Sequence, residues 1–316
     1  DRAEEKAVKA IQKHSIKIED LQYNRKIDEA YLLLGQARYF DRRFFPALEA
    51  FNFLLESGAN QNVYLQGKIW REKTNIRLKN HQLAINNLRP LAMRLIPQNK
   101  HFPQANATLA SAFINLKEID SASFYMKRAA LKAPKRKLKA RYLFITGQLF
   151  ESLGKKDSAL WAYQEIVALK RKSPRKFSIQ AKIKETLLDS TALFEDRLQA
   201  LSNLIKNFEN LSYQHALNRS IGTLYLEEDQ DSVALIYFEK SLQSPSIDSF
   251  TQIENYQDLA EYSFEKGNYL ESGLYLEKLL PLFEETSAAF KKLKRKLDNL
   301  SEVIIYERTL QQTDSL

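Results

Sequence analysis

The most constraining feature of the sequence is a small residue that recurs at intervals of 34 to 41 positions. These small residues are Ala47, Ala84, Ala122, Ala159, Ala200, Ala234 and Ser272. Four positions after each of them comes a large apolar residue: Phe51, Leu88, Met126, Tyr163, Leu204, Phe238 and Leu276. Because a period of roughly 20 to 50 residues is typical of stacked repeats, the chain is predicted to consist of about seven copies of one unit.

A second small residue, twelve positions before the first, indicates two helices in each unit. It occurs at Gly35, Ala110, Gly147, Gly222 and Ala260. A small side chain lets two helices approach to about 8–10 Å, and a large residue one turn away fills the space that remains. Two units depart from the pattern, because Glu72 and Leu188 stand where a small residue is expected, and Thr191 stands where the fifth unit should have an aromatic.

Composition favours an all-α chain. Eight Gly and eight Pro in 316 residues are too few for a chain of many tight turns, and helix-favouring Leu, Ala, Lys, Glu and Gln dominate. No apolar run approaches the roughly 20 residues that span a bilayer. The absence of cysteine excludes disulfides and thiolate metal sites. Since the chain begins without Met and without an apolar leader, we expect any targeting segment to have been removed or to lie upstream.

The spacing resembles the tetratricopeptide repeat (TPR), in which an apolar–small pair marks the first helix and a small residue followed by an aromatic marks the second. The clearest copies cover residues 106–134 and 143–174. The resemblance implies an all-α, right-handed TPR superhelix (α-solenoid) of about seven helix pairs with terminal capping helices. HEAT-like solenoids share the two-helix unit but do not require this pattern. A non-repetitive bundle would leave seven near-equal intervals unexplained.

The expected organisation has three parts. Residues 1–24 form an N-terminal capping helix, residues 25–283 form about seven TPR units with a period of 37–38 residues, and residues 284–316 form a C-terminal capping helix and tail. An apolar stripe in the last part fits either a cap that covers the exposed end of the stack or a seam between two copies. It consists of Leu293, Leu297, Leu300 and Ile304.

Nothing in the sequence indicates catalysis, a cofactor or a metal. The four histidines are too far apart in sequence for a helical metal site; they are His14, His81, His101 and His215. The glycine-rich phosphate loops and the strand-to-helix nucleophile turn are absent. We therefore predict a protein that is not an enzyme and binds neither cofactor nor metal.

Positive charge is concentrated in one region. Residues 127–184 hold 17 Lys and Arg against three acidic residues, whereas residues 225–285 hold 14 acidic residues against three lysines. Two turns between units carry clusters expected to lie together on one basic edge: Lys135, Arg136, Lys137, Lys139, Lys170, Arg171, Lys172, Arg175 and Lys176. This edge is either a solvated surface or a site for an acidic protein, anionic lipid or nucleic acid.

TPR proteins commonly bind peptides or partner helices on the concave face that their first helices build. By register with that family, the face would include Gln36, Tyr39, Lys73, Arg77, Ser111, Arg141, Phe144, Gln148, Arg219 and Glu261. The Lys/Asn clamp with which chaperone-binding relatives hold a C-terminal carboxylate is not reproduced. A groove for an extended peptide or a helix is therefore expected, without the chaperone-tail specificity.

The N-terminal end has a more specific resemblance. RAEEKAVKAIQKHS (residues 2–15) and IDEAYLLLGQARYFDRRFFPALEAFNFLL (residues 27–55) resemble the PorW/SprE family of TPR lipoproteins of the type IX secretion and gliding-motility system. The resemblance implies a lipoprotein on the periplasmic face of the outer membrane that links the ring and core of the machine to the outer-membrane translocon. Its lipid anchor is not present in this chain, and no catalytic residues come with the family.

The expected function is a protein–protein interaction scaffold of this secretion machine. Its partners would be ring or core components and the translocon. An alternative is a helical-repeat protein that binds nucleic acid through residues 127–184, and a third is a module that binds a lipid surface. Nucleic acid is the weaker choice, because the aromatic residues occupy repeat positions that pack the core.

Overall fold

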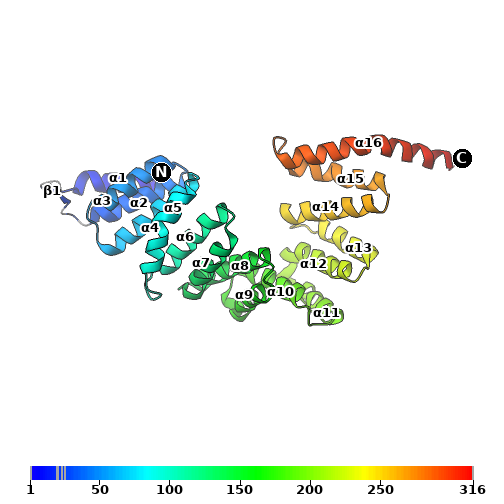
Figure 1. Cartoon of the computed structure of the whole chain (residues 1–316), viewed down its shortest axis with the longest axis horizontal. Coiled ribbons are helices and arrows are strands. Elements are labelled where there is room, and N and C mark those ends of the chain that lie inside the picture. Colours follow the sequence, from blue (N-terminus) through cyan, green and yellow to red (C-terminus); the bar gives the residue numbers. More distant parts are fainter. Residues whose placement is uncertain (1, 19–20, 23, 25, 315–316) are drawn as a thin grey trace. The chain divides into compact units, whose positions relative to one another are not determined.

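Antiparallel helices that follow one another in pairs make up almost the whole chain (Figure 1). The computed structural model describes residues 2–18, 21–22, 24 and 26–314. Its helices are α1 (Arg2–His14), α2 (Lys26–Phe40), α3 (Phe44–Glu56), α4 (Gln61–Arg77), α5 (His81–Arg94), α6 (Phe102–Asn115), α7 (Ile119–Lys132), α8 (Arg136–Ser152), α9 (Lys156–Ala168), α10 (Arg175–Leu188), α11 (Phe194–Lys206), α12 (Gln214–Glu227), α13 (Asp231–Leu242), α14 (Ser249–Glu265), α15 (Tyr269–Leu279) and α16 (Ala288–Asp314).

Shorter elements connect some of these helices. Strands β1 (Lys17–Ile18) and β2 (Leu21–Gln22) form an antiparallel hairpin after α1. The 3₁₀ turns are η1 (Lys170–Lys172), η2 (Phe208–Tyr213) and η3 (Leu280–Leu282). The all-α prediction is confirmed. Within the described part of the chain, no helix combines the length and the apolar character that crossing a bilayer requires.

The packing of small residues against large ones follows the predicted pattern. A Cβ added to Gly35 would lie 2.4 Å from the ring of Phe51. A Cβ added to Gly147 would lie 2.6 Å from the Tyr163 ring, and a Cβ added to Gly222 would lie 2.6 Å from the Phe238 ring. The small residues of the second helices are fully buried at Ala47, Ala84, Ala122, Ala159, Ala234 and Ser272. In these three glycine-containing pairs, the ring of the second helix therefore lies directly on the backbone of the first.

The turn between the two helices of a pair has the same backbone conformation in α2–α3, α4–α5, α6–α7, α8–α9, α12–α13 and α14–α15. One residue is left-handed, and the amide of the next residue donates to the carbonyl five positions earlier, which caps the C-terminus of the first helix. Gly154 has φ of 68°, and the Lys155 amide lies 2.9 Å from the Phe150 carbonyl oxygen. Glycine occupies this position only twice; the other left-handed residues are Arg42, Lys79, Lys117 and Asp229.

The pair α10–α11 is closed differently, and the sequence register there was wrong. Thr191 lies in the loop, where its amide donates to the Asp189 carboxylate at 3.0 Å. The Arg197 guanidinium donates to the Thr186 and Leu187 carbonyls at the end of α10. Ala200, predicted to be a core position, is exposed, and Leu201 is buried in its place. This change of one position follows from a turn that lacks the left-handed cap.

A buried charge replaces the small residue of α4. Glu72 is fully buried, and its carboxylate accepts hydrogen bonds from Asn75 at 2.7 Å and Asn87 at 3.1 Å. The Arg71 guanidinium lies 2.8 Å from the same carboxylate. A buried carboxylate is tolerated when its oxygens are paired in this way. Glu72, which departs from the small-residue pattern of the first helices, therefore forms a local polar network between α4 and α5.

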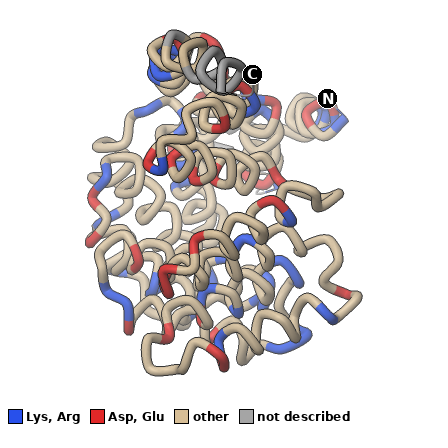
Figure 2. The backbone as a smooth tube through the Cα atoms, turned by 90° about the vertical axis from the view of Figure 1, so that its right-hand side faces the viewer, with Lys and Arg blue, Asp and Glu red and all other residues tan. Residues whose placement is uncertain are grey.

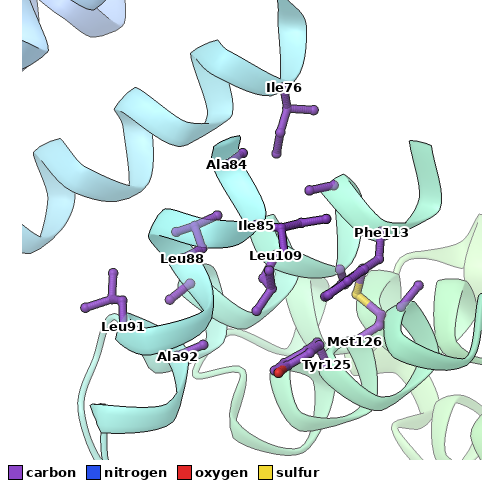
Figure 3. Close-up of a cluster of buried hydrophobic side chains, with 14 of the residues drawn as sticks. Ile76, Ala84, Ile85, Leu88, Leu91, Ala92, Leu109, Phe113, Tyr125 and Met126 are labelled. Carbon is purple, nitrogen blue, oxygen red and sulfur yellow. The ribbon is translucent and has the colours of Figure 1, made fainter. Parts of the chain in front are cut away.

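The apolar core continues from one pair to the next. In Figure 3, Ile76 of α4, Ile85 and Leu88 of α5 and Leu109 and Phe113 of α6 belong to one cluster of buried side chains. Buried apolar area of this kind is the main favourable term in folding. Because the cluster crosses the boundaries between pairs, it joins α4–α5, α6–α7 and α8 to one another.

The chain divides into two compact units, residues 1–178 and residues 179–316. In the first unit, α1 packs on the following pair through Ala7, with Val8 and Ile11 beside it. In the second unit, α16 covers α15, and Leu300 is buried. The remainder of the C-terminal stripe is half-buried in the same cluster, and comprises Leu293, Leu297 and Ile304. In the described structure this stripe contacts the chain's own α15.

Replacing the small residue of α8 is expected to destabilise the fold. Gly147→Leu places a side chain inside the Tyr163 ring and should cost about 1–3 kcal/mol of unfolding free energy. Tyr163→Ala should cost about 3–5 kcal/mol. The double variant should lose less than the sum of the two, because Leu fills the space that the ring leaves. Urea unfolding of all three variants measures this coupling, and strict additivity would contradict the packing described.

We expect the stability of the fold to depend on the negative charge of Glu72, and not only on a polar side chain at this position. Glu72→Gln keeps the shape of the side chain but puts an amide nitrogen where Asn75 or Asn87 donates. The expected loss is about 1.5–3 kcal/mol of unfolding free energy. The matched control is Glu49→Gln at an exposed position of α3, for which a change within about 0.5 kcal/mol is expected. Equal effects of the two substitutions in thermal or urea unfolding would refute the role assigned to Glu72.

Candidate functional site

The first helices of the pairs in the first unit, α2, α4, α6 and α8, line a groove of about 620 Å³. Its walls combine aromatic, aliphatic, polar and basic side chains. The lining residues are Tyr39, Phe40, Trp70, Lys73, Ile76, Arg77, Gln104, Ala107, Thr108, Ser111, Ile114, Met126, Leu138, Arg141, Tyr142 and Ile145. Only Met126 comes from a second helix, α7. The stacking of pairs thus brings residues from four distant segments to one surface.

One end of the groove is an aromatic cluster. The ring centres of Tyr39 and Trp70 are 5.3 Å apart with planes at 75°, and those of Phe40 and Trp70 are 5.6 Å apart at 69°. Edge-to-face contacts of this kind are a preferred geometry of aromatic rings. Phe40 is nevertheless 73% exposed. The cluster therefore holds a large apolar surface open to solvent.

Three cations line the groove without an acidic partner in its walls. Lys73, Arg77 and Arg141 are the charged residues, and none of the lining residues is Asp or Glu. Acidic residues are not scarce elsewhere, since both signs of charge occur along the backbone (Figure 2). Burial lowers the pKa of the Lys73 ammonium to about 8, with a smaller contribution from the positive charge of Arg141. A ligand carboxylate would relieve this unfavourable positive charge.

Lys73 also contacts the aromatic cluster. Its Nζ lies 4.2 Å from the centre of the Trp70 ring, within range of a cation–π interaction. The ammonium therefore lies over a face of the indole, and Lys73 also lines the groove. Aromatic and basic features of the site therefore meet at this side chain.

The basic turns surround a second hollow, of about 750 Å³. Lys135, Lys137 and Lys176 of the predicted basic edge line it together with Arg141. Its apolar lining consists of Leu138, Ile145, Pro174 and Phe177. The turn at residue 134 and the turn at residue 174 thus contribute to one surface, where they hold cations around an apolar floor.

The other residues of the predicted basic edge do not line this hollow. Lys139 forms an ion pair with Glu165, with Nζ 3.3 Å from the carboxylate. The exposed remainder lies on the turns or at helix starts and comprises Arg136, Lys170, Arg171, Lys172 and Arg175. The edge therefore contains a group that shares one hollow and a group that lies outside it.

The predicted concave-face residues divide in the same way. Those that line the groove are Tyr39, Lys73, Arg77, Ser111 and Arg141. Gln36 and Gln148 do not line it, and Phe144 packs against Tyr163 and Phe177, with ring centres 5.7 and 5.6 Å away. Phe144 thus contacts Phe177, which lines the basic hollow.

In the second unit, Arg219 is engaged within the protein. Its guanidinium lies 3.0 Å from Glu254 and 2.9 Å from Asp258, and it donates to the Asn255 side chain at 2.8 Å. These contacts join α12 to α14. The predicted concave-face position of Arg219 thus serves packing between pairs, and Glu261 is exposed.

Sequence reasoning missed Phe40, Trp70 and Tyr142, although helical spacing held a signal for Trp70. Trp70 precedes Lys73 by three positions and therefore shares its face of α4. Tyr142 directly follows Arg141 in α8, a spacing that does not place two residues on one face. Phe40 is the last residue of α2, and only the packing of α4 brings it to Trp70. Among the residues that the structure describes, no three His, Cys, Asp or Glu side chains converge as metal ligands would.

Comparison with known proteins bears on the fold. The chain is similar to a tetratricopeptide repeat protein from Parabacteroides merdae, with a TM-score of 0.60 and 12% identity, over 86% of this chain and 98% of that one. It is also similar to the C-terminal part of a TPR repeat-containing protein from Cytophaga hutchinsonii, with a TM-score of 0.48 and 13% identity, over 92% and 93% of the two chains. No family model and no curated protein matches. The first likeness confirms the TPR fold.

The environment of Lys73 predicts a specific dependence of stability on pH. The pKa of Lys73 is about 8 in the folded chain, whereas its ordinary value is 10.5. Between pH 8 and pH 10.5 the unfolded chain therefore binds more protons than the folded chain. Unfolding free energy should therefore rise from pH 8 to pH 10, by roughly 1–2 kcal/mol more than in Lys73→Met. Urea unfolding at the two pH values measures the difference. Lys156→Met, at an exposed position of α9, should retain the rise.

Proposed function

We propose that this protein is a non-catalytic scaffold for protein–protein interaction, and that the groove on the first helices of its first unit binds a segment of a partner protein. The observation that carries the proposal is the groove itself, with an aromatic end, an aliphatic floor and three cations without acidic neighbours in its walls. Such a combination is typical of a peptide or helix site, where a few buried anchors supply most of the affinity.

The aliphatic floor favours a partner with apolar side chains. Ile76 and Met126 are buried, while Ile114 and Ile145 are half-buried at the surface of the groove. Covering the exposed atoms of Ile114 and Ile145 removes apolar area from water, worth about 25 cal/mol per Å². Gln104, Thr108 and Ser111 lie on the same wall and offer hydrogen bonds to a main chain. The mixture suits a polypeptide, which presents both kinds of group.

We further propose that the scaffold belongs to the type IX secretion and gliding-motility machinery, on the periplasmic face of the outer membrane, where it links ring and core components to the translocon. The support for this assignment is the resemblance of residues 2–55 to TPR lipoproteins of that system. These residues run from α1 through α3, and Glu4 of α1 pairs with Arg38 of α2 at 3.0 Å and also with Arg43. The resembling segment therefore forms one end of the first unit.

Loss of partner capture is the expected result of changing the groove. The tagged chain should co-purify secretion-machine proteins from an envelope extract, identified by mass spectrometry. Phe40→Ala and Arg141→Glu, both at exposed positions, should each reduce capture at least fivefold, because they remove an apolar contact and reverse a charge.

The control for this experiment is Arg136→Glu, which changes an exposed cation outside both hollows. It should leave capture within twofold of the natural chain. Unchanged capture in both groove variants would refute the groove as the binding site. Capture that depends on the groove but yields no secretion-machine protein would refute the cellular assignment and leave the scaffold role intact.

A further inference from the structure

The groove and the basic hollow are two parts of one channel, because Leu138, Arg141 and Ile145 of α8 line both. We propose that this channel binds an acidic protein segment in a fixed polarity: an aromatic or large aliphatic anchor lies at the Trp70 end, and a cluster of carboxylates lies at the Lys135–Lys176 end. The inference rests on the proposed function and specifies the chemistry of the partner.

The aromatic end accepts an apolar anchor. Phe40 is largely exposed although it packs edge-on against Trp70, so a ligand side chain placed there buries surface that water now covers. Tyr39 closes the cluster from the side through its contacts with Phe40 and Trp70. A charged ligand group would lose hydration against these rings.

The opposite end accepts carboxylates. Lys135, Lys137, Arg141 and Lys176 surround the basic hollow, and no acidic residue lines it. The nearby Lys139 provides a contrast, because its charge is balanced by Glu165 and it lies outside the hollow. Cations that converge without a counterion attract an acidic ligand and steer its approach. Pro174 and Phe177 add an apolar contact surface beside these cations.

A protein fits this channel better than a nucleic acid. Single-stranded nucleic acids bind through bases stacked on open aromatic faces. Here Lys73 covers a face of Trp70, and the rings of Tyr39 and Phe40 meet edge to face at 87°. The floor between the two ends is aliphatic, through Ile76, Ile114 and Ile145. Aliphatic side chains of a polypeptide complement such a floor, whereas bases require flat partners.

The fold also sets the length of the segment. Trp70 belongs to α4 and Phe177 to the start of α10, so three steps between successive first helices separate the two ends. With about 8–10 Å for each step, the ends are roughly 24–30 Å apart. An extended chain rises about 3.3 Å per residue, which places the anchor and the acidic cluster roughly 7–9 residues apart.

Selection from a library of random 16-residue peptides, with the full chain as bait at about 0.1 M salt, tests this inference. Enriched peptides should carry an aromatic or large aliphatic residue roughly 7–9 positions from at least two Asp or Glu. Fluorescence anisotropy on the enriched peptides should show at least a tenfold weaker Kd for Lys135→Glu/Lys176→Glu. Phe40→Ala should weaken binding at least fivefold, and the matched control Arg136→Glu less than twofold. Circular dichroism establishes that each variant is folded.

Other outcomes overturn the inference in distinguishable ways. Enriched peptides without acidic residues, whose binding Phe40→Ala still weakens, would refute the acidic end and leave the groove function standing. Acidic peptides with no spacing preference would refute the fixed polarity. Failure to enrich any peptide would count against the inference and the proposed function together. A mixed-sequence single-stranded oligonucleotide that binds, and loses binding in Lys135→Glu/Lys176→Glu, would overturn the choice of a protein partner.

Discussion

Contact between a small residue on one helix and a large side chain on the next is the interaction on which this structure depends. Where Gly147 faces Tyr163, the ring lies on the backbone of α8, and no space remains for another side chain. The same contact recurs in α2–α3 and α12–α13, and repeated pairs within a unit stack with one face of their first helices in common. In the first unit that common face is the groove. The binding surface is therefore a direct product of the core packing.

Charged side chains are paired in the core, whereas the cations of the groove have no acidic partner in its walls. Buried Glu72 is satisfied by Asn75, Asn87 and Arg71, and Arg219 is satisfied by two carboxylates and an amide. Buried charges are retained only when they are paired in this way. Lys73 and Arg141 have no such neighbour in the groove walls; burial lowers the pKa of Lys73, and the positive charge of Arg141 lowers it further. Under the proposed function, the bound segment supplies a carboxylate that pairs with Arg141, which lines both the groove and the basic hollow.

Only part of the predicted concave face lines the groove, for reasons that particular residues make clear. Tyr39, Lys73 and Arg141 were placed by family register and line the groove. Phe144 has the right register for that face, yet the start of α10 covers it through Phe177. In the fifth pair the register itself changed by one position, because Arg197 caps α10 where other pairs use a left-handed residue. Four of those left-handed residues are not glycine, so sequence alone did not reveal the turn.

The sequence by itself determined the all-α class, the paired helices and the small-against-large contacts, because these depend on periodicity and side-chain volume along one segment. It also located the excess of positive charge. Only the tertiary structure decided which cations share a hollow, which ones are neutralised by a carboxylate from another helix, and where Phe40 meets Trp70. These relations join residues tens of positions apart, and small differences in turn geometry and helix rotation set them. A repeat pattern fixes the period of a stack but not the contacts between its members.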